Sequence, residues 1–121
     1  MFLRFVAGNK IKRKNEYHGI ITQAKIMIEQ EILEIIDISK IDDIFQVLNN
    51  NLPCPPFSKK SWPNNAISWF KESAEEYIKL MYQLKIIIEK YGCETLVLKT
   101  EDAGKKIYED DFQIVATNKK Y

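Results

Sequence analysis

All four prolines of the chain lie in one segment, residues 52–65, which has the sequence LPCPPFSKKSWPNN. Proline fixes its own φ angle, removes a backbone donor and pushes the preceding residue away from the helical region. The segment is therefore predicted to be a stiff loop. Helices and strands are expected before and after it, and the aromatic and basic side chains within it either anchor the loop or contact a partner.

The clearest regular element follows this segment. Ser73 and Glu76 have the spacing of a capping box, and Gly92 is placed as the glycine that ends a helix. The apolar positions between them recur at helical spacing: Tyr77, Leu80, Met81, Leu84, Ile87, Ile88 and Tyr91. The pattern predicts a long amphipathic helix with a single apolar face.

Three elements are expected before the proline segment. Residues 1–7 (MFLRFVA) alternate and precede a Gly-Asn pair, which predicts a strand that ends near Ala7. A first helix is predicted over residues 18–33, and a second from a capping box at Ser39 and Asp42 to about Asn50. The apolar positions of the two helices are Ile20, Ile21, Ala24, Ile28 and Leu33, and then Ile41, Ile44, Phe45 and Leu48.

The C-terminal third is interpreted as a hairpin. Residues 93–100 and 105–118 predict two strands joined by a turn at 101–104, and the second strand would place Phe112, Ile114 and Ala116 on one face. Residues 64–73 (NNAISWFKES) are interpreted as helical, either as an extension of the long helix or as a separate turn.

These elements predict a single α+β domain over residues 1–121, in which a small, mostly antiparallel sheet packs against two or three helices. The N-terminal strand and the C-terminal hairpin would form the sheet. A second copy could cover the other sheet face to give a homodimer, if that face is apolar. Its expected residues are Leu3, Phe5, Leu96, Leu98 and Val115.

Charge and targeting signals narrow the function classes. The formal net charge of +1 gives no whole-molecule argument for nucleic acid, so binding there would depend on a local basic corner. That corner consists of Lys10, Lys12, Arg13 and Lys14. The sequence shows no signal peptide and no membrane-spanning apolar run, and Cys54 and Cys93 are expected to be reduced thiols. A cytoplasmic protein without a membrane partner is expected.

Glu109, Asp110 and Asp111 are the only candidate set for metal chemistry that the sequence offers. Neighbours in a strand point to opposite faces, so Glu109 and Asp111 would share a face and Asp110 would not. Pairing of these carboxylates with Lys99, Lys105 and Lys106 is the favoured interpretation. A small metal-dependent hydrolase is the third hypothesis, and no metal, cofactor or catalytic residue is expected.

The proline segment is the favoured binding site. Exposed aromatic rings beside rigid prolines lose little entropy when they dock against a protein, and interleaved lysines could also hold phosphates. The predicted partner-binding residues are Pro55, Pro56, Phe57, Lys59, Lys60 and Trp62. Whether this loop or the acidic cluster carries function stays open at this point.

The motifs LPCPPF, WPNNAISWFK and GKKIYEDDFQIVA, with LRFVAGN at the start, resemble a small bacterial family of hypothetical proteins over most of the chain. The resemblance implies a stand-alone cytoplasmic domain and carries no known activity, cofactor or catalytic residue. The leading hypothesis is a non-enzymatic protein-interaction module, an adaptor or an inhibitor encoded by a mobile element. A nucleic-acid-associated protein is the second.

Overall fold

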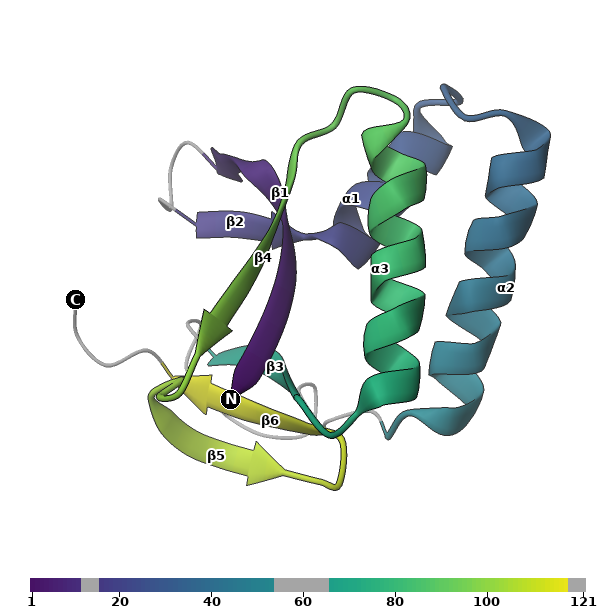
Figure 1. The fold of residues 1–121 in the computed structure, drawn as a ribbon. Coiled ribbons are helices and arrows are strands. Elements are labelled where there is room, and N and C mark those ends of the chain that lie inside the picture. Colours follow the sequence, from purple (N-terminus) through teal and green to yellow (C-terminus); the bar gives the residue numbers. More distant parts are fainter. Residues whose placement is uncertain (12–15, 54–65, 118–121) are drawn as a thin grey trace.

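The computed structural model describes residues 1–11, 16–53 and 66–117, and it confirms an α+β fold (Figure 1). A curled antiparallel sheet lies on one side of three helices. The elements in chain order are β1 (Phe2–Ile11), β2 (Glu16–Gly19), α1 (Ile20–Glu29), α2 (Ile35–Asn51), β3 (Ala66–Lys71), α3 (Glu75–Glu89), β4 (Thr95–Thr100), β5 (Lys105–Glu109) and β6 (Gln113–Thr117).

Strand β1 is the centre of the sheet. One of its edges pairs with β4 from Phe2 to Ala7. The other edge pairs with β3 at Phe2 and Leu3 and with β2 from Val6 onward. Strand β6 continues the sheet between β3 and β5. Because β1 changes neighbours along its length, β2 and β3 diverge and the sheet curls.

The main core lies between the sheet and the helices. Helix α3 packs on the sheet through two edge-to-face ring pairs, Phe5 with Tyr82 and Tyr77 with Phe112, each with 5.0 Å between ring centroids. Helix α2 packs outside α3 (Figure 1). The inward stripe of α3 is buried and consists of Tyr77, Met81, Leu84, Ile87 and Ile88. None of the helices in the described ranges is both long and apolar enough to cross a bilayer.

The first strand is longer than predicted. It continues through the expected Gly-Asn turn to Ile11, with a register shift between Val6 and Lys10. Gly8 permits this because its N–H donates to the Glu94 carbonyl at 2.7 Å, and a Cβ at Gly8 would lie 3.0 Å from the Glu94 Cβ. The glycine allows a close approach of β1 to Glu94, the residue before β4, and does not form a turn.

Both predicted capping boxes are wrong. Helix α2 begins at Ile35, so Ser39 lies inside it, and its N-cap Glu34 makes no side-chain cap bond. Helix α3 has Ala74 as N-cap, also without a side-chain bond. Ala74 is buried, and its N–H donates to the Lys71 carbonyl at 3.0 Å, so a tight turn after β3 sets the helix start. The prediction for Gly92 is confirmed, with a φ of 86°.

The segment 66–71 is a strand, which corrects both helical interpretations of it. Each of its residues from Ala66 to Phe70 pairs with β6, and Phe70 also pairs with Leu3. Trp69 and Phe70 are half-buried on opposite faces of this strand, and Phe70 packs against the main core. The partners are distant in sequence, so the local pattern did not contain this pairing.

The C-terminal hairpin forms between other segments than the two that were predicted to pair. Strand β4 pairs with β1, and the hairpin forms between β5 and β6. Asp110 makes the turn, because its carboxylate accepts the N–H groups of Phe112 at 2.8 Å and Gln113 at 3.0 Å. The predicted single strand over 105–118 is therefore divided at Asp110.

The five residues predicted to form an apolar dimer face do not share one face of the sheet. Leu3 and Phe5 face the helices and Val115 is fully buried, whereas Leu98 pairs with Arg4 on the opposite side of the sheet. A small apolar cluster lies on that opposite side. The cluster consists of Ala103, Ile114 and Ala116, with Phe2 and Trp69 packed against it.

Candidate functional site

Most of the residues predicted to bind a partner lie outside the described ranges. Pro55, Pro56, Phe57, Lys59, Lys60 and Trp62 belong to the segment 54–65, which is not described. Of the basic corner, Lys10 lies in β1. Its other members, Lys12, Arg13 and Lys14, lie outside the described residues. Both sets stay predictions.

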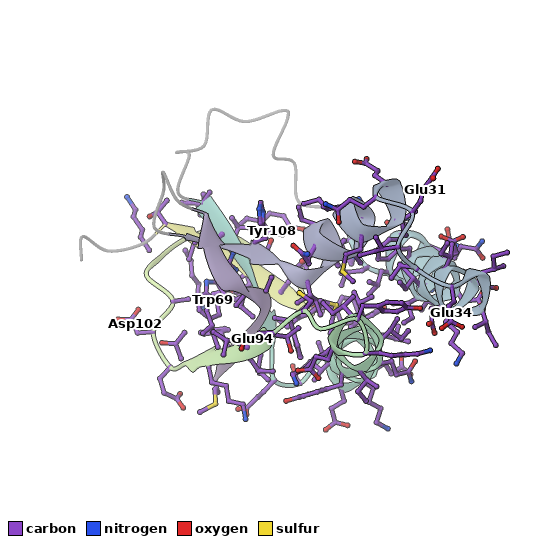
Figure 2. All side chains as sticks on the ribbon, turned by 90° about the horizontal axis from the view of Figure 1, so that it is seen from above. Glu31, Glu34, Trp69, Glu94, Asp102 and Tyr108 are labelled. Atoms are coloured by element: carbon purple, nitrogen blue, oxygen red, sulfur yellow. The ribbon has the colours of Figure 1, made fainter. Side chains whose placement is uncertain are left out.

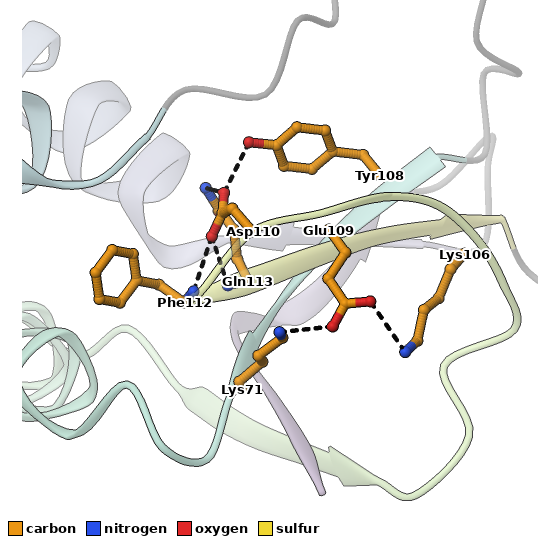
Figure 3. Close-up of polar contacts among 7 residues, drawn as sticks. All are labelled: Lys71, Lys106, Tyr108, Glu109, Asp110, Phe112 and Gln113. Atoms are coloured by element: carbon orange, nitrogen blue, oxygen red, sulfur yellow. Dashed lines mark hydrogen bonds and ion pairs between the residues drawn. The ribbon is translucent and has the colours of Figure 1, made fainter.

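The acidic cluster is held by donors of the protein itself (Figure 3). The Glu109 carboxylate accepts Lys71 Nζ at 2.6 Å and Lys106 Nζ at 3.3 Å, and these bonds lower the pKa of Glu109. Of the predicted lysine partners, only Lys106 pairs with it. Lys71 is the last residue of β3, a segment that was predicted to be helical.

Asp110 has a different set of partners. Its partial burial acts to raise its pKa, but the Phe112 N–H, the Tyr108 hydroxyl and the Gln113 donors together lower it. Asp110 and Asp111 lie beyond the end of β5, so strand alternation does not place Glu109 and Asp111 on a shared face. Within the described ranges, no three His, Cys, Asp or Glu side chains converge as a metal site would require.

A buried carboxylate joins the start of α2 to the end of α3. Asp37 is 2% exposed, accepts Lys90 Nζ at 2.9 Å and also accepts the Tyr91 hydroxyl. The Glu34 N–H donates to the same hydroxyl oxygen at 3.0 Å. The hydrogen bond from Tyr91, and then that from Lys90, lowers the pKa of Asp37. These contacts fix the two helices as antiparallel neighbours.

The outer side of this helix pair carries an apolar groove of about 390 Å³. Its floor contains Ile44 and Ile87, which are 5% and 9% exposed. Its rims carry Val47 at 40% and Ile86 at 67% exposure, and Ile36 is 60% exposed one turn before Lys40 on α2. The full lining is Lys40, Asp43, Ile44, Val47, Leu80, Gln83, Ile86 and Ile87. We call this surface, together with Ile36, the outer helix face.

The outer helix face was not predicted from the sequence. The predicted start of α2 at Ser39 left Ile36 outside any helix, and Ile86 was not among the predicted apolar positions of α3. The run Ile86-Ile87-Ile88 was the available signal, because three consecutive apolar residues span more than one face of a helix.

A second hollow, of about 430 Å³, lies where β2 and β3 diverge, and Arg4, Ile20, Ser68 and Trp69 are among its lining residues. Trp69 lies on the sheet side of the molecule, away from α2 (Figure 2). Its Nε1 is buried, and in the described part of the chain it has no hydrogen-bond partner.

Comparisons with protein-family models, with curated proteins and with solved structures each found no match.

Proposed function

We propose that the chain is a non-enzymatic protein-interaction module and that the outer helix face is its docking surface. The observation that carries this proposal is the exposure of Val47 and Ile86, at 40% and 67%, along one groove with an apolar floor, with Ile36, 60% exposed, one turn before the groove residue Lys40 on α2. Single exposed apolar residues are ordinary, but a contiguous apolar patch with a polar rim is typical of protein contact sites.

The shape of the surface indicates the form of the partner. Two antiparallel helices leave a furrow between them, and a third helix packs into such a furrow with its own apolar ridge. Lys40, Asp43 and Gln83 provide a polar rim of both signs and a neutral amide. A helical surface with apolar residues at helical spacing fits this surface. An adaptor or an inhibitor acts by such docking.

Three carboxylates of the described residues are engaged by donors of the protein itself, which favours this proposal over hydrolysis. Glu109 and Asp110 are engaged by lysines and turn donors, and Asp37 by Lys90 and Tyr91. Each group has a structural role that accounts for its position. The proline segment, with Pro55, Pro56 and Trp62, is proposed as a further contact region of the same module.

Site-specific photo-crosslinking in living cells tests the docking surface. A photoreactive residue at position 86 should give a protein adduct of discrete mass. The matched control is position 96, because Leu96 is also exposed, at 41%, but lies on β4. No adduct from position 86, or equal adducts from both positions, would contradict the proposal.

A further inference from the structure

We infer that the partner that covers the outer helix face is a second copy of this chain, packed about a two-fold axis. The inference depends on the proposed docking surface and names its occupant. In a two-fold interface the same surface contacts itself, so each residue must suit its counterpart on the other copy. The outer helix face meets this requirement.

Helix α2 presents a self-complementary stripe. Ile36, Lys40, Asp43 and Val47 follow one another at intervals of four, three and four residues, so they lie along one side of the helix. Lys40 lies four residues after Ile36, and Asp43 lies four residues before Val47. When two copies of α2 lie antiparallel, a single register therefore pairs Ile36 with Val47 and Lys40 with Asp43, twice over.

Helix α3 supplies the centre of the same interface. The contact of Asp37 with Lys90 sets the level of the two antiparallel helices, and Lys40 and Ile87, three residues further inward on each helix, line the same groove. Ile86 therefore lies next to the midpoint between Lys40 and Asp43. An axis through that midpoint brings Ile86, 67% exposed in a single chain, against Ile86 of the second copy.

The size of the surface sets the expected strength. Helix α2 has 17 residues, which gives a length of about 25 Å, and two packed helices are about 20 Å wide. The contact is then about 500 Å² per copy, below the roughly 800 Å² of a standard stable complex. We therefore expect a dimer that dissociates in the micromolar range.

Sedimentation velocity on the purified chain tests the inference. Between about 1 and 300 µM the average mass should rise from monomer toward dimer. Lys40→Asp should weaken the dimer at least about tenfold, because it places two carboxylates opposite each other at two positions. Asp43→Lys should do the same with two lysines. The residues are exposed, and circular dichroism checks that each variant is folded.

Two combinations test the register itself. The double variant Lys40→Asp/Asp43→Lys should dimerise like the unchanged chain, because the opposite charges are restored. A mixture of the two single variants should form a heterodimer, although each alone is monomeric. Asp42→Lys is the matched control, since Asp42 is exposed on α2 but lies off the stripe, and it should leave the dimer unchanged.

A monomer at every concentration would overturn the inference, as would a dimer that none of these changes affects. The docking surface would survive the first result if the crosslinker at position 86 still captured a different protein. Loss of that adduct as well would overturn both proposals.

Discussion

The two sides of helix α3 carry the same kind of residue in different environments, buried on one side and exposed on the other. Leu84 and Ile88 are fully buried against the sheet and the other helices, whereas Ile86, one turn or less away, is 67% exposed. Burial of the first two stabilises the fold because their surface leaves water on folding. The surface of Ile86 remains available for a second burial on association. Position around the helix, and not residue type, decides whether a residue belongs to the core or stays exposed.

The largest effect is expected from the inner side. Leu84→Ala should lower the free energy of unfolding by about 3 to 5 kcal/mol, because it removes buried methyl groups and leaves a cavity. Ile86→Ala should change it by about 0.5 kcal/mol or less. Urea denaturation at a chain concentration that keeps the protein monomeric measures both. Equal losses would mean that Ile86 is part of the core.

Substitution of Trp69, which lies in β3, should lower the free energy of unfolding by an intermediate amount. Trp69→Ala should cost about 2 to 3 kcal/mol, because the half-buried ring packs on the cluster of Ile114 and Ala116. Trp69→Phe should cost clearly less, because the Nε1 that it removes has no partner in the described residues. A thermal melt unchanged by Trp69→Ala would show that the ring lies outside the small cluster.

A buried and an exposed carboxylate, Asp37 and Glu109, allow the same comparison. Asp37 is buried and its pKa is lowered from the ordinary value of 3.8. A lowered folded-state pKa contributes stability above the unfolded value, and this stability is lost as the pH falls through the folded pKa. Asp37→Asn should therefore lower stability at neutral pH and reduce its decline below about pH 4. Unfolding midpoints across pH 2 to 7 measure both.

The smallest effect is expected at Glu109. It binds Lys71 at 2.6 Å, closer than Lys90 binds Asp37 at 2.9 Å, but its side chain is 45% exposed. Solvent screens such a pair, so Glu109→Gln should change the melting temperature far less than Asp37→Asn does. Higher salt should remove the remaining difference in melting temperature between Glu109→Gln and the unchanged protein. A larger loss at Glu109 would show that distance outweighs burial here.

Local patterns predicted the elements that depend on neighbours in sequence. The apolar spacing in residues 18–33 predicted a helix, of which α1 occupies Ile20–Glu29, and the spacing from Tyr77 to Ile88 predicted the buried stripe of α3. The α+β class followed from these elements and the alternating ends of the chain.

The parts that failed depend on distant partners. Strand β3 exists because Ala66 to Phe70 pair with β6, nearly 50 residues later in the chain, and no pattern within residues 64–73 contains that information. Strand β4 was assigned to a neighbouring hairpin, but its partner is β1 at the other end of the sequence. Asp37 was not among the predicted core or site residues, although its spacing of four from Ile41 places it on the buried stripe.

The docking of the outer helix face is the central claim, and amide NMR spectra of a dilution series test it most directly. As the chain is concentrated, shifts should grow at Lys40, Asp43, Val47, Gln83 and Ile86, and the amides of β5 and β6 should stay unchanged. Shifts confined to the sheet, or no shift at any concentration, would contradict the claim that this face buries its apolar residues on a second copy.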